Sequence, residues 1–191
     1  MDIEVNASAN SSSTSPAQTK HAHTKKQFKH RNCAKVVCNI NTKMIEVRKA
    51  IPEDLHAISE FQVKMAWETE SLALFPETVM NGVKAVFDKP TRGQYWIATN
   101  NNEAIASLLI TYEWSDWRNT DVWWLQSVYV VPEFRRKGVF RKMYSHIKAE
   151  AEKQDVAGLR LYVETNNAAA QKTYETLGMK SEHYRLYEWL K

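Results

Sequence analysis

The sequence predicts an α/β fold, in which one domain has a mixed central β-sheet flanked by about four helices and follows a disordered tail. Segments with the period of a strand alternate with segments with the period of a helix, and no stretch repeats another. A chain of 191 residues that is 43% apolar suits one packed domain. Near residue 43 a polar, Ser-rich stretch gives way to this alternation. We therefore expect a tail over 1–43 and a domain over 44–191.

The tail explains the overall charge of +4. Residues 1–43 hold seven basic and two acidic residues, or +5, which leaves 19 basic and 20 acidic residues, or −1, for the domain. The tail contains no Gly and includes Asn-Ser-Ser-Ser-Thr-Ser-Pro, a composition typical of disorder. The domain is accordingly not expected to bind nucleic acid.

Potential metal ligands and address signals also lie in the tail. Its histidines and both cysteines of the chain are His21, His23, His30, Cys33 and Cys38. Their spacing fits no standard zinc pattern, so we expect no metal. A nuclear localisation signal is the alternative reading of a basic cluster in the tail, which consists of Lys25, Lys26, Lys29 and Arg31. With no apolar run of membrane-spanning length and no secretory signal at Met1, a cytoplasmic location is expected.

The first half of the domain is expected to hold three strands and two helices. A short alternating strand begins at Met44. Pro52 suits the first turn of the helix that follows, whose apolar stripe consists of Leu55, Ile58, Phe61, Val63, Met65 and Trp67. A second helix is expected over 77–88. Two strands, 95–99 and 104–111, are predicted to form a hairpin that an Asn-rich turn joins.

The second half is expected to alternate strand and helix. A strand over 122–131 ends before Pro132, which cannot donate a ladder hydrogen bond. Apolar residues then recur at helical spacing; they are Val139, Phe140, Met143, Tyr144, Ile147 and Ala151. A strand over 159–163, a helix over 167–177 that Gly178 stops, and a strand over 183–190 complete the expected elements.

A cationic turn joins the strand over 122–131 to the helix after it. Its residues are Arg135, Arg136, Lys137 and Gly138. The first turn of a helix has backbone N–H groups without partners, and the aligned peptide dipoles give it partial positive charge. Cationic side chains and a glycine that permits close approach make this turn a predicted site for a phosphorylated ligand; a solvated basic surface is the alternative.

The motif Arg135-x-x-Gly138-x-Phe140 resembles the coenzyme A diphosphate loop of the GNAT superfamily of acyl-CoA-dependent N-acetyltransferases. The pattern of that family is Gln/Arg-x-x-Gly-x-Gly/Ala, so Phe140 stands where a small residue is usual, and its ring must point away from the diphosphate. The order of elements over 44–190 is also similar to the GNAT fold.

A second motif, Asn167-x-x-Ala170-x-x-x-Tyr174-x-x-x-Gly178, supports the resemblance. In the family the asparagine contacts the cofactor arm and the tyrosine commonly faces the thioester sulfur; a tyrosine that fills core space is the alternative. The resemblance implies a set of acetyl-CoA-binding residues, which are Val128, Tyr129, Val130, Arg135, Arg136, Lys137, Gly138, Val139, Phe140, Arg141, Asn167, Ala170 and Tyr174.

The resemblance implies an enzyme that transfers the acetyl group of acetyl-CoA to a primary amine by direct attack in a ternary complex. Tyr174 is the expected general acid towards the thiolate. Members of the family often use a glutamate on the strand before the diphosphate loop, where this chain has Gln126, whose amide can hold water or substrate. Glu113 is the first candidate for the base and Glu70 the second, with a solvated loop charge as the alternative for either.

Aromatic and acidic residues cluster around the end of the second hairpin strand. They are Tyr112, Glu113, Trp114, Asp116, Trp117 and Asp121. Such a cluster either packs as a lid over the core or binds a ligand, and aromatic faces with carboxylates suit a cationic amine. We expect a small basic or aromatic amine as acceptor, bound by Glu70, Tyr112, Glu113, Trp114 and Trp117.

Other functions stay open at this point. A non-catalytic acyl-CoA-binding module is one, with Gln126 and Phe140 as signs of lost chemistry. A protein lysine acetyltransferase aided by the basic tail is another, and a terminal strand leaves a homodimer open. A dinucleotide-binding enzyme is set aside, because the chain contains no Gly-x-Gly-x-x-Gly.

Overall fold

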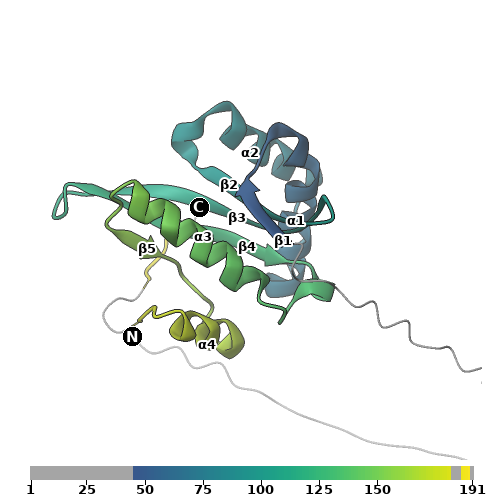
Figure 1. Cartoon of the computed structure of the whole chain (residues 1–191). Helices are drawn as coiled ribbons and strands as arrows, with labels where there is room; N and C mark the ends of the chain where they lie inside the picture. Colours follow the sequence, from purple (N-terminus) through teal and green to yellow (C-terminus); the bar gives the residue numbers. More distant parts are fainter. Residues whose placement is uncertain (1–44, 182–185, 190–191) are drawn as a thin grey trace, which may run out of the picture. The chain divides into compact units, whose positions relative to one another are not determined.

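The computed structural model describes residues 45–181 and 186–189 (Figure 1). The predicted tail and its metal-ligand candidates lie outside these residues. The strands are β1 (Ile45–Lys49), β2 (Gln94–Asn100), β3 (Glu103–Ser115), β4 (Thr120–Val130) and β5 (Gly158–Arg160). The helices are α1 (Leu55–Glu70), α2 (Pro76–Asp88), α3 (Val139–Lys153) and α4 (Ala168–Thr176), with short 3-10 turns at Pro52–Asp54, Pro90–Arg92 and Pro132–Phe134.

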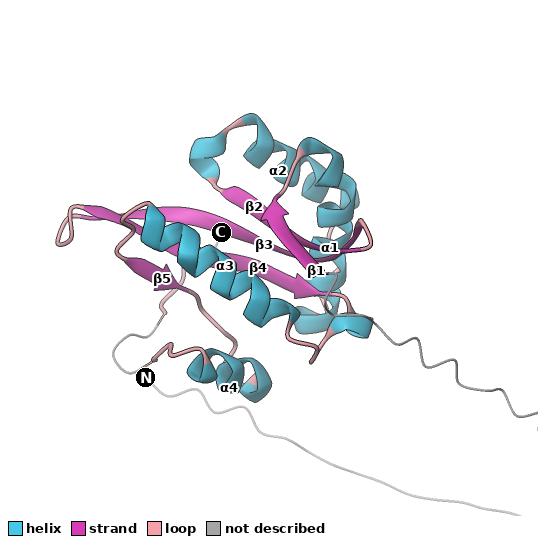
Figure 2. Ribbon diagram, in the orientation of Figure 1, coloured by secondary structure: helices cyan, strands magenta, loops and turns pink. Residues whose placement is uncertain are grey.

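The five strands form one mixed sheet in the order β1-β2-β3-β4-β5 (Figure 2). The first three pairings are antiparallel, and β4 pairs with β5 in parallel. A parallel pairing needs a crossover connection, which α3 supplies between β4 and β5. The predicted α/β fold, with its mixed sheet and four helices, is confirmed.

Helices cover both faces of the sheet, because successive strand residues point to opposite faces. On one face α3 contributes Val139, Met143 and Ile147 to a core that includes Trp96 of β2. Figure 1 shows α3 lying across this face. On the other face the neighbouring Tyr95 and Ile97 pack with residues of α1 and α2, among them Ile58 and Val83.

Some predicted elements differ from the observed ones. Trp67, which we placed on the apolar stripe of α1, is 62% exposed, because it stands nine residues beyond buried Ile58 and so on the opposite side of a helix with 3.6 residues per turn. The predicted strand over 159–163 ends at Arg160, since β5 pairs only with Val122–Trp124. Of the predicted strand over 183–190, the described residues 186–189 form none.

Within the part of the chain that the structure describes, no helix is both long enough and apolar enough to cross a membrane.

Candidate functional site: an open helix terminus beside an open strand edge

Gly138 stands immediately before α3 with φ of 78°, a left-handed conformation that glycine adopts without steric cost. Among residues 45–181 and 186–189, no side chain caps this helix by hydrogen bonding. The backbone N–H groups of its first turn therefore have no partner within the helix and no capping oxygen. A Cβ built on Gly138 would meet no atom within 4 Å, so the turn is open to a ligand. These features fit a bound phosphate group.

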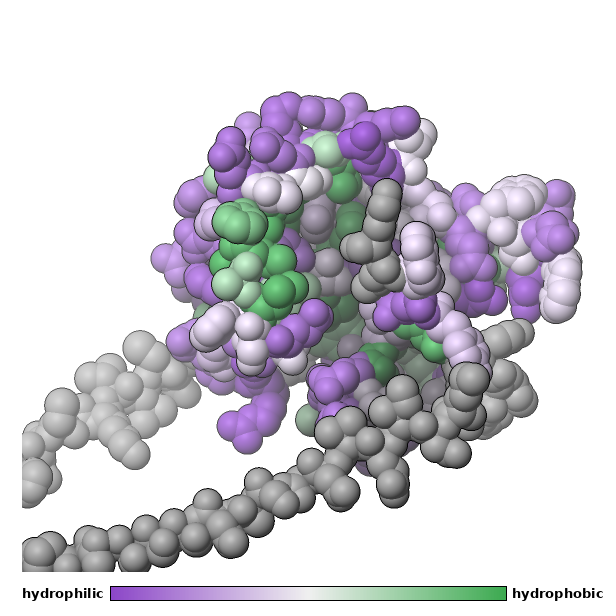
Figure 3. Space-filling model, turned by 180° about the vertical axis from the view of Figure 1, so that it is seen from behind, coloured by the Kyte–Doolittle hydropathy of each residue, from purple (hydrophilic) through white to green (hydrophobic). Residues whose placement is uncertain are grey.

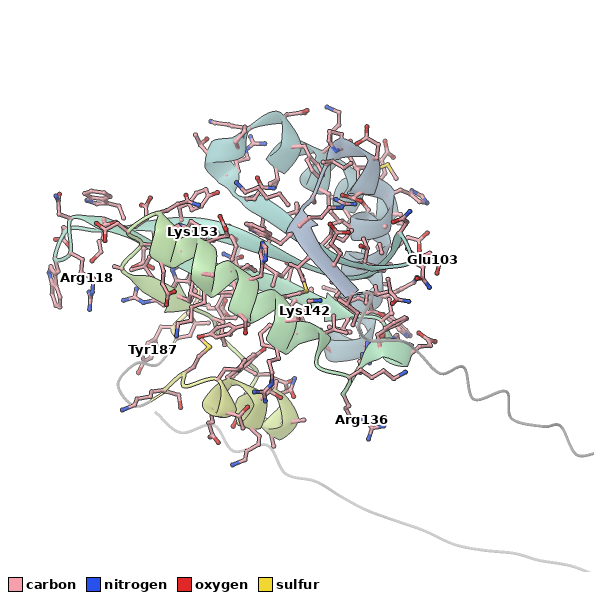
Figure 4. All side chains as sticks on the ribbon, in the orientation of Figure 1. Glu103, Arg118, Arg136, Lys142, Lys153 and Tyr187 are labelled. Atoms are coloured by element: carbon pink, nitrogen blue, oxygen red, sulfur yellow. The ribbon has the colours of Figure 1, made fainter. Side chains whose placement is uncertain are left out.

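The cations around this turn fall into two groups. Arg135 forms an ion pair with Glu68, and Lys142 donates a hydrogen bond to the Ile45 carbonyl of β1. Arg136, Lys137 and Arg141 are exposed and have no ion pair among the described residues. Figure 4 shows the Arg136 side chain projecting away from the ribbon at the start of α3.

A bulge interrupts β4 before this turn. Ser107 of β3 faces Tyr129, whereas Leu109 faces Gln126, so one residue of β3 lies opposite two of β4. The extra residue is accommodated at Ser127, whose φ is 51°. A bulge leaves backbone groups unpaired and bends the strand, and such bulges are common next to active sites.

The outer edge of β4 is open beyond Trp124. β5 pairs with β4 only at Val122–Trp124, so in the described part of the chain the edge of β4 from Leu125 to Val130 has no strand partner on that side. An open edge presents backbone N–H and C=O groups that an extended ligand can pair with. The pantetheine-binding role that we predict for Val128, Tyr129 and Val130 therefore has backbone groups available to it.

Tyr174 of α4 lies beside the start of α3. Its ring centroid is 5.5 Å from that of Phe140, in an edge-to-face arrangement, and Phe140 also packs against Tyr144 at 6.2 Å. Phe140, which replaces the usual small residue, thus directs its ring towards α4. Burial raises the pKa of the Tyr174 phenol above its usual 10.0, so this group is a proton donor at neutral pH.

Asn167 caps α4. Its Oδ1 accepts a hydrogen bond from the Ala170 backbone N–H at 3.0 Å, which satisfies one of the N–H groups of the first turn. This contact leaves the amide nitrogen as the donor that Asn167 can offer to a ligand. Cofactor binding by Asn167 and Ala170 stays a prediction.

Glu113, our first candidate for the base, is held by two neighbours. Trp124 Nε1 donates to its Oε2, and Arg160 Nη1 donates to its Oε1 at 2.5 Å. The hydrogen bond from Trp124, followed by that from Arg160, lowers the pKa of this carboxyl despite some desolvation. Glu113 also lies five residues beyond Leu108, at the bulge, which is about 17 Å along a strand. These contacts favour a structural role, so basic catalysis by Glu113 stays a prediction.

Gln126 lies beside the bulge itself. Its Nε2 donates to Thr111 Oγ1 at 2.6 Å, which fixes the orientation of the amide. The carbonyl oxygen of the amide is therefore the atom that can accept a hydrogen bond from an amine or a water.

The other predicted acceptor-binding residues are spread along the surface. Trp114 is 61% and Trp117 85% exposed at the end of the β3–β4 hairpin, so the alternative that they pack as a lid over the core is wrong. Tyr112 packs edge-on against the buried Trp123. Glu70 is exposed at the last position of α1. The structure does not bring these residues together with Tyr174.

Glu68, which was not among the predicted site residues, directly contacts the loop before α3. Its carboxylate accepts hydrogen bonds from the Tyr129 hydroxyl at 2.9 Å and from Arg135 Nη2 at 2.5 Å. A signal was available, because Glu68 stands two helical turns after the buried Phe61 and so continues the apolar stripe of α1. A carboxylate on such a stripe indicates a specific partner.

No group of three or more His, Cys, Asp or Glu in 45–181 or 186–189 is arranged to hold a metal ion.

Comparison with known proteins identifies the family of this chain. The family model of the acetyltransferase (GNAT) family matches residues 53–179. A possible acetyltransferase from Clostridium difficile 630 is 41% identical, with a TM-score of 0.72 over 78% of this chain and 98% of that one. The fold is also shared by an aminoglycoside N-acetyltransferase solved in complex with CoA, at 16% identity and a TM-score of 0.63 over 77% of this chain and 94% of that one.

A more limited match concerns a curated Escherichia coli K12 enzyme, the ribosomal protein bS18-alanine N-acetyltransferase. It is 39% identical over 61 residues, which are 32% of this chain and 41% of the length of the enzyme. The family match, in contrast, spans β2 to β5, α3 with its open N-terminus and the helix that carries Tyr174. The chain therefore belongs to the acetyltransferase (GNAT) family.

Proposed function

We propose that this protein transfers the acetyl group of acetyl-CoA to a primary amine by direct attack within a ternary complex. The observation that carries the proposal is the open N-terminus of α3, and two further features support it. The uncapped N-terminus of α3 at Gly138 suits a diphosphate, the open edge of β4 suits the amide groups of a pantetheine arm, and Tyr174 lies beside the first turn of α3.

These residues suit acetyl-CoA as a bound substrate. The open turn at Gly138 and the cations Arg136 and Lys137, which form no ion pair in the described chain, match the negative charge of a diphosphate. Phe140 is compatible with this arrangement, because its ring packs on Tyr174 and Tyr144. Backbone groups at the bulge of β4 are available to hold the thioester carbonyl and to stabilise the oxyanion that forms during attack.

The chemistry requires three events. The neutral amine attacks the carbonyl carbon of the thioester and forms the new C–N bond. The C–S bond then breaks, and the Tyr174 hydroxyl donates a proton to the departing thiolate. The attacking nitrogen loses one proton to solvent, and the tyrosine regains one from solvent. The products are therefore an amide and a free thiol. Holding the two reactants in place accounts for a large part of the expected rate enhancement.

The amine is best positioned by Gln126. Its amide is fixed by Thr111 and lies on β4 next to the bulge, where it can accept a hydrogen bond from the amine or from a water that carries the proton away. Glu113 is less suited to this task, because its contacts lower its pKa and because it lies further along the hairpin.

For the acceptor we propose a small basic or aromatic amine. The α1–α2 region exposes large apolar side chains, among them Trp67, Leu72 and Phe75, and the face of the molecule opposite α3 shows an apolar patch (Figure 3). A protein amine is the second candidate, since the E. coli relative is named for an alanine of a ribosomal protein.

An acceptor screen tests the proposal. Purified protein is mixed with acetyl-CoA and a panel of small basic, aromatic and acidic amines, together with a peptide that begins with alanine and one that contains lysine, and thiol release is measured. We expect turnover with basic or aromatic amines. Turnover confined to acidic amines would contradict the acceptor class, and turnover confined to peptides would favour the protein substrate.

The screen also separates the enzyme from a non-catalytic acyl-CoA-binding module. Calorimetric binding of CoA without thiol release from any acceptor would support that alternative. The cytoplasmic location and a homodimer rest on the sequence alone and stay predictions.

Removing the cations next to Gly138 is expected to weaken binding of CoA. For Arg136→Gln and for Lys137→Gln we expect the Kd of CoA to rise about 3- to 10-fold at low salt, because each loses a charge-assisted contact with a phosphate. The loss should shrink as salt rises, since exposed charges are screened. Calorimetry at two salt concentrations measures both effects.

Arg118→Gln is the matched control, because Arg118 is an exposed cation at the end of the β3–β4 hairpin (Figure 4). It removes the same charge far from the loop and should leave the Kd unchanged. Equal losses for Arg118→Gln and the two loop variants would show that net charge, not local contact, governs binding.

A further inference from the structure

Glu68 joins three separate elements of the cofactor site. It stands in the last turn of α1, and its two carboxylate oxygens accept hydrogen bonds from Tyr129 of β4 and from Arg135 of the loop before α3. α1 also packs on the same strand through Phe61, whose ring lies 5.3 Å from that of Tyr129. The end of β4 beyond the bulge therefore contacts α1 through the Phe61–Tyr129 ring pair and through the hydrogen bond from Tyr129 to Glu68.

Arg135 makes three contacts in this arrangement. Its Nη2 donates to Glu68 at 2.5 Å, its Nε donates to the Val130 carbonyl at 2.8 Å, and its guanidinium lies 5.3 Å from the centre of the Tyr129 ring. Glu68 neutralises its charge. Arg135 is therefore turned back towards α1 and the end of β4, and the cations without an ion pair in the described chain around Gly138 are Arg136, Lys137 and Arg141.

The ion pair is not expected to contribute much to global stability. The side chains of Arg135 and Glu68 are 42% and 36% exposed, and exposed pairs contribute about 0–1 kcal/mol. The Arg135–Glu68 pair is expected to matter for the position of the loop instead. Arg135 also binds the Val130 carbonyl, and Val130 and Arg135 are the two ends of the segment that precedes Gly138. A contact that fixes these ends limits where the first-turn N–H groups of α3 can lie.

We propose that Glu68 is a positioning residue for acetyl-CoA, holding Arg135 as a brace between α1 and β4 and thereby fixing the loop whose amides bind the diphosphate. The inference rests on the proposed function, since it concerns the same ligand. It assigns Arg135 to support of the loop, whereas the motif alone made Arg135 a ligand of the diphosphate.

Two variants distinguish a brace from a phosphate ligand. If Arg135 is a brace, Glu68→Gln should raise the Kd of CoA about 5-fold, and kcat at saturating acetyl-CoA should stay within about 2-fold, since the reacting groups are untouched. If Arg135 is a phosphate ligand, Glu68→Gln releases it for binding and the Kd falls. Arg135→Lys keeps the charge but loses the planar group that donates to Glu68 and Val130 from two separate nitrogens, so as a brace it should also raise the Kd.

A double-mutant cycle tests whether the two residues act through one contact. Calorimetry with CoA is carried out on the wild type, Glu68→Gln, Arg135→Gln and the double variant. We expect the double variant to bind CoA about as well as the weaker single variant, because both single changes break the same contact. Losses that multiply would show independent effects and would overturn the inference.

Asp88→Asn is the matched control on the neighbouring helix. Asp88 pairs with Lys84 at 2.6 Å within α2, so this variant breaks an exposed ion pair without touching Glu68 and should leave the Kd and kcat unchanged. An unchanged or lower Kd for Glu68→Gln would overturn the inference while wild-type binding upholds the proposed function. A wild-type protein that binds no CoA would overturn both.

Discussion

Tyr174→Phe is expected to lower kcat for acetyl transfer about 100-fold, because it removes the proton donor for the departing thiolate. The ring remains, so its edge-to-face contact with Phe140 and the position of α4 should be retained. We therefore expect the Kd of CoA to stay within about 2-fold of the wild-type value, which places the loss in the chemical step. Thiol release at saturating substrates and calorimetry with CoA measure the two quantities.

The pH dependence of the Tyr174→Phe effect follows from the same phenol. Burial raises the pKa of Tyr174 above 10.0, so the proton is present throughout the range from pH 6 to 9. The ratio of wild-type to variant kcat should be constant over that range. It should fall only when the pH exceeds the raised pKa, where the wild type loses its proton donor.

Tyr144→Phe is the matched control for this prediction. Tyr144 packs against the same phenylalanine from α3, and burial raises its pKa as well, but it belongs to the core of the sheet face that α3 covers. This variant should retain kcat. An unchanged kcat for Tyr174→Phe, or an equal loss in both variants, would contradict the role of Tyr174 as the acid.

Gly93→Ala is expected to lower the free energy of unfolding by about 3 kcal/mol or more. Gly93 precedes β2 with φ of 153°, and a Cβ there would lie 2.4 Å from the Ile110 carbonyl oxygen and 2.9 Å from Leu109 Cδ1. The first of these atoms is backbone of the central strand β3, which cannot move without disturbing its pairing with β2 and β4. Urea unfolding followed by circular dichroism measures the change.

Gly82→Ala makes the same chemical change without the clash. Gly82 lies inside α2, and a Cβ there would meet no atom within 4 Å. Alanine is favoured over glycine in a helix interior, so this variant should gain about 0.5–1 kcal/mol. Similar stabilities for Gly93→Ala and Gly82→Ala would show that the contact with Ile110 is relieved by small shifts.

The fold could be predicted because its signals are local. The alternation of strand and helix periods placed α1 to α4 and the first four strands, and Gly138 with its basic neighbours marked the start of α3. The hairpin strands were predicted too short: β3 and β4 extend to Ser115 and from Thr120, since their pairing continues through polar residues that carry no apolar alternation.

The details of the site depended on contacts between distant segments, which periodicity does not encode. The bulge at Ser127 arises from the register between β3 and β4. Glu68 and Arg135 meet although they lie 67 positions apart. Arg160 approaches Glu113 only because β5 pairs in parallel with β4 after the α3 crossover. Glu113, the first candidate for the base, therefore has hydrogen-bond partners that the sequence pattern does not reveal.

The topology of the sheet also bears on how the chain folds. β2, β3 and β4 follow one another as hairpins and can pair with little loss of loop-closure entropy, whereas β1 must close a loop of some 50 residues and β5 must wait for the α3 crossover. We expect the central meander to form early and the two outer strands to join late. The parallel pairing that ends at Trp124, and with it the boundary of the open β4 edge, would then be among the last parts of the domain to assemble.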